Sequence, residues 1–285
     1  MNLILQSLAP DRHVIERIAA IAGALQVTAI NASAFRCEGV GFSDAIRTAV
    51  EAACHAEQID CCFIAAGLRL HDFKLLAMDM DSTLITIECI DEIADMQGLK
   101  PQVAAITEAA MRGEIEFNES LARRVALLAG LDASALQRVF DERLRLSPGA
   151  EIMLAAVKAA GLKTLLVSGG FTFFTERIRQ RLGLDHAHSN ELEIIDGKLT
   201  GRVLGSIVNA EEKKRTVQRL CNELGISSAA AIVMGDGDND LQMMGIAGLS
   251  VAFRAKPIVR AQASVALNFV GLDGILPLFE TAQPV

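Results

Sequence analysis

The sequence has few aromatic residues and contains neither tryptophan nor tyrosine. Phenylalanine supplies all of the aromatic content, 4% of 285 residues. This scarcity argues against an all-β sandwich and against a platform that stacks the bases of single-stranded nucleic acid. The formal net charge is −8, so the chain has no bulk attraction for nucleic acid or for an anionic membrane. Any phosphate must therefore be bound by a few local cations or by a metal ion.

Paired cysteines and long apolar runs are also missing. None of the six cysteines forms a C-x-x-C pair, and the adjacent Cys61 and Cys62 are badly placed for a disulfide or a shared metal. Apolar runs such as residues 61–68 are much shorter than the roughly 20 residues that a bilayer requires. No basic segment precedes the apolar start, which argues against a secretory signal. We expect reduced thiols in a soluble, cytoplasmic protein.

The first 70 residues differ from the rest of the chain. They contain no lysine, and five arginines face seven acidic residues. Apolar periodicity predicts the following elements: strands at 2–8, 27–32, 34–37 and 60–66, a helix at 11–25, and a second helix capped by Ser43. This βαββαβ order predicts a small α+β domain at residues 1–70, which resembles ACT-like regulatory domains in the order of its elements.

From Phe73 onward the pattern is that of a parallel α/β sheet. Short apolar strands are predicted at 74–78, 163–167 and 229–234, with a hairpin arm at 191–195. Between the first two lies a long helical insertion. We therefore predict an α/β, Rossmann-like core formed by residues 71–88 and 147–285, with a helical cap inserted at residues 89–146.

Two aspartates follow the first core strand. Asp79 and Asp81 are two residues apart, so both side chains point to the same side of an extended chain. The carboxyl end of a strand is where open α/β sheets bind ligands. Two unpaired carboxylates there would repel each other, and a divalent cation such as Mg²⁺ would relieve that repulsion.

A second acidic loop follows the strand at 229–234. It reads Gly235-Asp236-Gly237-Asp238-Asn239-Asp240 and again suggests a hard cation. A calcium-binding EF-hand is excluded, because Leu241 stands where that loop needs glycine and Ala247 where it needs glutamate. The loop is therefore interpreted as part of the same cleft as Asp79.

Two further segments can hold an anion. Ser168-Gly169-Gly170 ends a strand and offers a hydroxyl and closely approachable backbone N–H groups. Lys213, at the start of a helix, can neutralise phosphoryl oxygens. Each signal alone is weak, since such turns and charged helix starts are common.

Taken together and in this order, Asp79/Asp81, Ser168, Lys213 and Asp236 resemble the four motifs of the haloacid dehalogenase-like phosphohydrolases. The resemblance covers residues 74–277. It implies that Asp79 is the nucleophile and Asp81 the general acid and base. It also implies that Mg²⁺ is held by Asp79, Asp236 and the backbone carbonyl of Asp81. Ser168, Gly169 and Lys213 would hold the phosphoryl group, and Asn239 would support the substrate or the metal site.

Local strings are closest to the members of that family that hydrolyse O-phospho-L-serine. They are residues 79–84, Glu88 with residues 90–94, residues 117–125, and residues 168–171. Such a substrate carries an ammonium and a carboxylate besides its phosphate, so its pocket needs one anion and one cation more. Glu88 is expected to bind the ammonium and Arg124 the carboxylate. The activity implied is the last step of serine biosynthesis.

Helix geometry chooses between two adjacent arginines. Leu121, Val125 and Leu128 define an apolar stripe, and Arg124 lies much closer to that stripe than Arg123 does. Arg124 is therefore predicted to reach inward, while Arg123 faces water. Asp238 departs from the family pattern, where a small residue is common, and replaces no expected ligand.

Two other functions stay open. A related phosphatase or phosphotransferase could act on another small phosphate such as phosphohomoserine. Alternatively, an amino-acid-sensing regulatory protein could carry a silent phosphatase core, although the intact Asp79, Asp81, Lys213 and Asp236 argue against it. His186 and His188 are interpreted as part of a surface loop, because no third metal ligand is evident. No nucleic-acid or membrane partner is expected, and a homodimer is possible.

Overall fold

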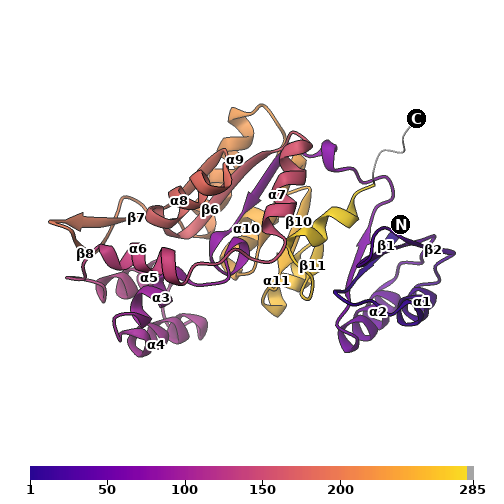
Figure 1. Cartoon of the computed structure of the whole chain (residues 1–285), viewed down its shortest axis with the longest axis horizontal. Helices are drawn as coiled ribbons and strands as arrows, with labels where there is room; N and C mark the ends of the chain where they lie inside the picture. The colour runs from indigo at the N-terminus through magenta and orange to yellow at the C-terminus, as the bar shows by residue number, and fades with distance from the viewer. Residues whose placement is uncertain (281–285) are drawn as a thin grey trace.

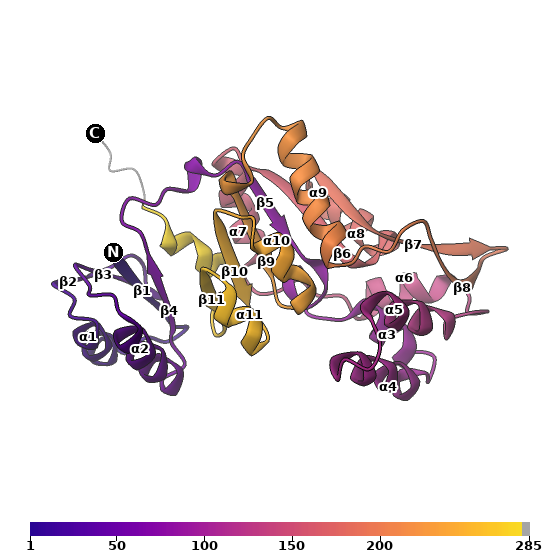
Figure 2. The same cartoon turned by 180° about the vertical axis from the view of Figure 1, so that it is seen from behind.

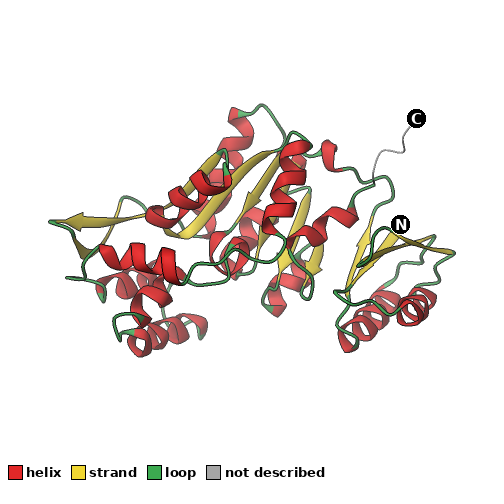
Figure 3. Ribbon diagram, in the orientation of Figure 1, coloured by secondary structure: helices red, strands yellow, loops and turns green. Residues whose placement is uncertain are grey.

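The computed structural model describes residues 1–280 as two β-sheets with their helices (Figures 1 and 3). The larger sheet has seven strands in the order β11-β10-β9-β5-β6-β7-β8. Its strands are β5 (Leu75–Met78), β6 (Lys163–Phe171), β7 (His186–Ile195), β8 (Lys198–Leu204), β9 (Ala231–Gly235), β10 (Leu249–Phe253) and β11 (Val265–Leu267). All neighbouring pairs are parallel except β7 with β8. The predicted α/β class is confirmed.

Helices cover both faces of this sheet, which explains why its strands are continuously apolar. Leu76 and Met78 of β5 pack on the face of α7 (Ala150–Ala159) and α8 (Thr172–Leu182). Leu75 and Ala77 point to the opposite face, toward α9 (Ala210–Glu223), α10 (Leu241–Met244) and α11 (Pro257–Gln262). Figure 2 shows α9 and α10 in front of the sheet, with α7 and α8 behind it.

The chain order reverses around β5. From β5 the chain passes to β6 on one side and later returns to β9 on the other side. Loops that leave β5 and its two neighbours therefore diverge at this point and open a crevice at the carboxyl ends of the strands. At this crevice Asp79 and Asp236 follow their strands, whereas Ser168 lies within the last part of β6, which extends beyond the predicted end at residue 167.

The β7–β8 hairpin corrects one interpretation. His186 and His188 lie in β7, where they pair with Leu165 and Val167 of β6, and not in a surface loop. The strand is longer than its apolar pattern suggested because only its second half, from Glu191, pairs with β8. His188 faces Glu212 at 3.5 Å. The first half of β7 could not be predicted from apolar periodicity because it contains polar residues, including His186 and His188.

Five α-helices lie between β5 and β6 in the chain, and the four that precede α7 form the insertion. They are α3 (Cys89–Asp95), α4 (Lys100–Met111), α5 (Phe117–Ala126) and α6 (Ser134–Glu142). They lie beside the β7–β8 hairpin at one end of the larger sheet (Figure 1). Leu121, Val125, Leu136 and Val139 join the hydrophobic core on one face of that sheet. This group covers the carboxyl end of β5.

The N-terminal residues form a separate four-stranded antiparallel sheet in the order β2-β3-β1-β4. Its elements are β1 (Asn2–Gln6), α1 (Arg12–Ile21), β2 (Gln26–Ala29), β3 (Ala34–Glu38), α2 (Asp44–Ala56) and β4 (Asp60–Ile64). The predicted βαββαβ order is confirmed, and Ser43 caps α2 by accepting from the Ile46 amide. The domain limits at 70, 88 and 146 stay predictions.

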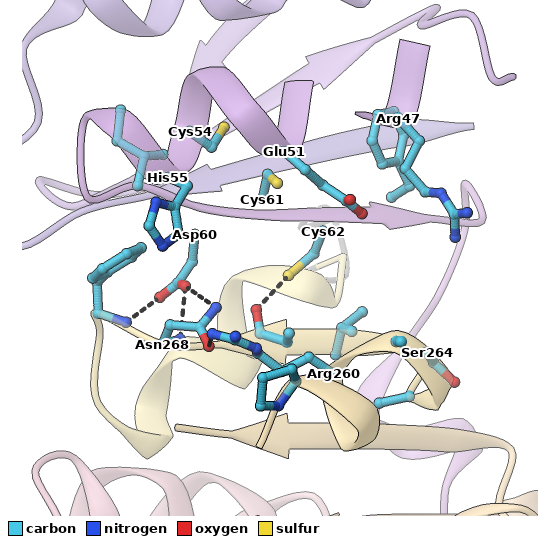
Figure 4. Close-up of a pocket in the computed structure, with 18 of the residues that line it drawn as sticks. Arg47, Glu51, Cys54, His55, Asp60, Cys61, Cys62, Arg260, Ser264 and Asn268 are labelled. Carbon is cyan, nitrogen blue, oxygen red and sulfur yellow. Dashed lines mark hydrogen bonds between the residues drawn. The ribbon is translucent and has the colours of Figure 1, made fainter. Parts of the chain in front are cut away.

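A buried carboxylate, Asp60, joins the two sheets, and Figure 4 shows its hydrogen bonds to Asn268. Asp60, at the start of β4, is 1% exposed and accepts hydrogen bonds from the amides of Asn268, Phe269 and Val270 at 2.7–3.0 Å. Arg36 of β3 donates to the carbonyls of Pro277 and Phe279. These contacts attach the N-terminal sheet to the segment that follows β11. No helix among residues 1–280 is long and apolar enough to cross a membrane.

Replacing Asp60 by alanine is expected to destabilise the protein by about 3 kcal/mol, because three backbone donors lose their acceptor at a closed junction. Urea unfolding of the purified variant measures the effect. Asp72→Ala is the matched control, since Asp72 is exposed and contacts only the exposed His71. An unchanged urea midpoint for Asp60→Ala would contradict this prediction, because water would then satisfy the three amides without a loss of stability.

Candidate active site

Asp79 stands immediately after β5 and is 5% exposed. Its own amide donates to the Met234 carbonyl of β9, so the backbone is still held by the sheet at this residue. One carboxylate oxygen accepts from the Met80 amide at 2.7 Å, and the other lies 2.9 Å from Lys213 Nζ. The carboxylate is thus fixed in one orientation at the floor of the crevice.

A tight turn at Met80–Leu84 follows and positions two more carboxylates. Ser82 has a φ of 55°, in the left-handed region that a serine rarely adopts. Its hydroxyl donates to Glu88 at 2.6 Å, which ties Glu88 to the turn. Asp81 accepts from the Cys89 amide through one oxygen, while its other oxygen is buried without a hydrogen-bond partner among the described residues. That oxygen is available to a ligand.

Lys213 lies in the first turn of α9 and is fully buried. Its ammonium contacts Asp79 at 2.9 Å and Asp240 at 2.8 Å. Burial by itself lowers the pKa of Lys213, but Asp240 and Asp79 outweigh that effect and raise the pKa above its ordinary value. Lys213 therefore keeps a positive charge beside Asp79 at any physiological pH.

The acidic loop after β9 is organised by Asp240. This residue is fully buried and accepts from the amides of Asp236 and Gly237, both at 3.1 Å. Its other oxygen binds Lys213, so Asp240 has little capacity left for a further ligand. Asp236 is oriented by Thr83, whose hydroxyl donates to it at 3.0 Å. Asp236 retains free lone pairs toward the crevice.

The end of β6 is irregular where it reaches the crevice. The register with β7 shifts between Val167 and Phe171, and the Ser168 hydroxyl accepts from the Gly170 amide at 2.9 Å. A Cβ at Gly170 would stand 3.1 Å from Ser168 Oγ and 3.4 Å from Asp81 Oδ2. Glycine thus lets the strand end pass close to the carboxylates.

These residues line one cavity of about 290 Å³. Among the residues selected from the sequence, the following line it: Asp79, Asp81, Glu88, Arg124, Ser168, Gly169, Asp236 and Asn239. Lys213 lies behind Asp79 and contacts the cavity through it. Arg124 of α5 reaches the cavity, whereas Arg123 is exposed and pairs with Glu119. The helix-face argument thus matches the positions of both arginines.

The carboxylates of this cavity hold their protons strongly. Burial raises the pKa of Asp81 to about 8, with Glu88 adding to the effect. Burial and the nearby Asp240 raise the pKa of Asp236 to about 7. The pKa of Asp79 is also well above its ordinary value, because burial and Asp240 outweigh Lys213. Too many negative groups therefore share the site for one ammonium to balance.

The donor set fits a hard divalent cation. Carboxylate oxygens of Asp79, Asp236 and Asp240 lie within 4.8 Å of one another. Because Asp240 is already bound to Lys213 and two amides, Asp79 and Asp236 are the side chains that can hold the ion. Oxygen-only ligands of this charge suit Mg²⁺. A divalent cation would offset the repulsion among these buried carboxylates, whose pKa values burial raises.

Magnesium is expected to raise the thermal midpoint by about 5 °C at a concentration about 100 times its Kd. The increase should be larger at pH 8 than at pH 5. The pKa of Asp81 is raised from 3.8 to about 8 in the folded protein, and that of Asp236 to about 7. Folding therefore becomes less favourable as the pH rises from about 4 to 8, because these groups bind protons more tightly in the folded state. A bound cation offsets this loss of stability at the higher pH. Thermal melts at both pH values measure it. A midpoint shift of the same size in Asp236→Asn would contradict the assignment.

Comparison with known proteins agrees with this geometry. A model of the haloacid dehalogenase-like hydrolases matches residues 76–245. A HAD family hydrolase from Salmonella enterica subsp. enterica serovar Typhi superimposes with a TM-score of 0.90 at 33% identity, covering 99% of this chain and 100% of that one. The fold and the cavity define the class: a haloacid dehalogenase-like hydrolase.

Relatives narrow the class further. Phosphoserine phosphatase of Polaromonas sp. (strain JS666) is 60% identical over 216 residues, which are 74% of this chain and 92% of the relative. A phospho-aspartyl intermediate analogue of phosphoserine phosphatase superimposes with a TM-score of 0.69 at 37% identity, covering 73% of this chain and 99% of that one. The chain belongs to the phosphoserine phosphatase family.

Three residues of the site did not emerge as site residues from the sequence. Asp240 was assigned only to the acidic loop, yet it holds Lys213 and both amides of that loop. Asp91 of α3 lines the cavity, and one of its oxygens is buried without a partner among the described residues. Lys256, which precedes α11, also lines it. Only the pairing of Lys213 with Asp79 and Asp240 in the folded structure identifies Asp240 as a residue of the site.

Proposed function

We propose that this chain hydrolyses O-phospho-L-serine to L-serine and phosphate with Mg²⁺ as cofactor. The observation that carries the proposal is the composition of one cavity. Glu88 and Arg124, of opposite charge, line the same 290 Å³ space as Asp79 and Ser168. Binding of a simple phosphate ester requires neither side chain, whereas a phosphorylated amino acid has an ammonium and a carboxylate that require both.

The substrate is expected to be oriented by its two amino-acid charges. The Arg124 guanidinium binds the carboxylate in a forked geometry, and Glu88 binds the ammonium. This places the phosphate toward the carboxyl end of β5. There the Ser168 hydroxyl and the Gly169 backbone hold phosphoryl oxygens as charge redistributes during the reaction, and the positive charge of Lys213, behind Asp79, attracts the phosphoryl group. Asn239, at the rim of the same cavity, supports the bound substrate.

Asp79 acts as the nucleophile. Its carboxylate oxygen attacks phosphorus, the bond from phosphorus to the serine oxygen breaks, and an acyl phosphate forms on Asp79. Lys213, at 2.9 Å, holds the carboxylate in place for that attack. When bound by Asp79, Asp236 and the carbonyl of Asp81, Mg²⁺ supplies positive charge that offsets repulsion between carboxylate and phosphate.

Asp81 transfers the protons. Burial raises the pKa of Asp81, which favours the protonated form that donates to the departing serine oxygen. It then takes a proton from water, whose oxygen attacks phosphorus and breaks the bond to Asp79. Phosphate leaves, and both carboxyl groups return to their starting states. The helices α3–α6 cover the cavity and limit the access of other water.

Phosphate release from a panel of phosphate esters tests the proposal. O-phospho-L-serine should be hydrolysed with the highest kcat/KM, and release should require Mg²⁺. Comparable rates with phosphohomoserine would favour a broader phosphatase, and a phosphorylated product in the presence of added alcohols would indicate transfer. Absence of release from every ester with Mg²⁺ present would favour the silent regulatory protein.

A further inference from the structure

Asn190 is a buried polar residue close to the active site that the reaction described above does not use. It lies in β7, where it pairs with Phe171 at the end of β6, and it is 1% exposed. Its side chain does not line the cavity that contains Asp79. Burial of an amide side chain costs free energy unless its donor and its acceptor both find partners. The partners of Asn190 therefore indicate what it does.

Both ends of this amide are bound to backbone groups of other segments. Asn190 Nδ2 donates to the Gly169 carbonyl at 2.7 Å, and Oδ1 accepts from the Val208 amide at 2.8 Å. These partners fix the orientation of the side chain, because a carbonyl only accepts and a backbone N–H only donates. Asn190 thus joins the end of β6 to the segment that enters α9.

The contact with Gly169 fixes the peptide group between Gly169 and Gly170. In a trans peptide the carbonyl and the N–H point in opposite directions. The Gly169 carbonyl is turned toward Asn190, and the Gly170 N–H donates to the Ser168 hydroxyl oxygen at 2.9 Å. Because that oxygen accepts from the backbone, the hydroxyl proton of Ser168 is directed elsewhere and can be donated to a phosphoryl oxygen.

A peptide between two glycines needs such a restraint. Gly169 and Gly170 both line the cavity, and neither has a Cβ, so the plane of their peptide can turn over at little steric cost. In the reversed orientation the Gly169 carbonyl oxygen would face the phosphoryl oxygens and repel them. The Gly170 N–H would at the same time leave the Ser168 hydroxyl.

The contact with Val208 acts on the helix that carries Lys213. Val208 precedes Asn209, which caps α9 by accepting from the Glu212 amide at 3.1 Å. The Lys213 amide donates to the Asn209 carbonyl at 2.9 Å. The hydrogen bond from Val208 to Asn190 therefore holds the start of α9 against the end of β6.

We propose that Asn190 is a positioning residue for the reaction. It keeps the Gly169 carbonyl out of the cavity and sets the Ser168 hydroxyl to donate to the phosphoryl group. It acts through these backbone groups and does not contact the substrate. This inference rests on the proposed function, in which Ser168 and the Gly169 backbone hold phosphoryl oxygens.

The variant Asn190→Asp tests this role because its side chain can be switched by pH. A protonated aspartic acid donates to the Gly169 carbonyl and accepts from the Val208 amide, as asparagine does. The ionised form has only acceptor oxygens, and one of them would face the Gly169 carbonyl oxygen. The peptide then loses its restraint, so the variant should work at low pH and fail at high pH.

The quantity to measure is the kcat/KM for O-phospho-L-serine of Asn190→Asp divided by that of the unsubstituted protein. This ratio should be within about threefold of one at pH 5 and should fall at least about thirtyfold by pH 8. Ionisation of the cavity carboxylates is common to both proteins and cancels in the ratio. The same holds for the charges nearest to Asn190, which belong to His188, Glu212 and Lys213.

Phosphate binding gives a second measurement that needs no turnover. In calorimetric titrations with inorganic phosphate and Mg²⁺, the Kd of Asn190→Asp should be at least about tenfold higher than that of the unsubstituted protein at pH 8. At pH 5 the two Kd values should agree within about threefold. If the unsubstituted protein bound phosphate but hydrolysed no ester, the proposed function would fail while the role of Asn190 could still be judged.

Ser189→Ala is the matched control. Ser189 is the preceding residue of β7, is also buried, and shares a hydrogen bond of 2.7 Å with Thr175 of α8. This variant loses a buried hydrogen bond away from the phosphate-binding segments, so its kcat/KM should change less than about threefold at both pH values.

Thermal melts at each pH show whether the variants are folded at the assay temperature. If Asn190→Asp is unfolded at pH 8, Asn190→Ser replaces it, because a hydroxyl cannot reach both Gly169 and Val208. Its kcat/KM should be at least about tenfold lower at both pH values. Three results would overturn the proposal: a ratio for folded Asn190→Asp that does not change with pH, an Asn190→Ser variant that retains full activity, or an equal loss in Ser189→Ala.

Discussion

Asp79→Asn is expected to reduce kcat for O-phospho-L-serine at least about 10⁴-fold. The amide that replaces the carboxylate cannot form an acyl phosphate, so the reaction loses its covalent route. Asparagine has the same shape and can still accept from the Met80 amide, as Asp79 does at 2.7 Å. The loss is therefore chemical, and far-UV circular dichroism should be unchanged.

The fold should tolerate this change for an electrostatic reason. Lys213 keeps its contact with Asp240 at 2.8 Å, so the buried ammonium remains paired. Replacing Asp79 also removes a buried carboxylate and its repulsion with Asp240, the two effects that raise the pKa of Asp79. Asp238→Asn is the matched control, because Asp238 is an exposed acid of the neighbouring loop and does not line the cavity. Residual turnover of Asp79→Asn near that of Asp238→Asn would refute the assignment of the nucleophile.

Arg124→Ala should lower kcat/KM for O-phospho-L-serine by about 10²- to 10³-fold, because the substrate carboxylate then enters the cavity without its partner. A phosphate ester without a carboxylate, such as p-nitrophenyl phosphate, should lose less than about threefold. Phosphate release from the two esters gives both values. The informative quantity is the ratio of the two kcat/KM losses, because a merely structural defect would reduce kcat/KM for both esters equally.

The neighbouring arginine provides the control. Arg123 lies on the same helix and is exposed, and within residues 1–280 its ion pair is with Glu119. Arg123→Ala should therefore leave both esters unaffected. An equal loss on both esters in Arg124→Ala would mean that this arginine supports α5 and the covering helices rather than the substrate.

Much of the site could be predicted from the sequence because its residues follow strands. Asp79, Ser168 and Asp236 each stand at the end of an apolar segment, and the ends of parallel strands meet at one edge of a sheet. Local periodicity was also enough to distinguish Arg124 from Arg123. These inferences need only the direction of a side chain along its own element.

Periodicity was less informative where pairing, rather than burial, defines an element. The amino half of β7 carries His186 and His188, which are polar, and it is held in the sheet by β6. The strands β10 and β11 follow the acidic loop and were not separated from their surroundings by composition. Their place at the edge of the sheet, beside β4, depends on which strands pair.

By itself, the sequence determined the α/β class, the position of the helices after the first core strand, and most of the charged residues that line the cavity. These features can be inferred from the sequence because apolar periodicity and the ends of apolar segments are visible over short stretches of the chain. Tertiary structure alone decided that Lys213 is shared by Asp79 and Asp240 and that Asp60 joins two sheets. The residues in these contacts are separated by 27 to 210 positions in the sequence, so only the folded arrangement brings them together.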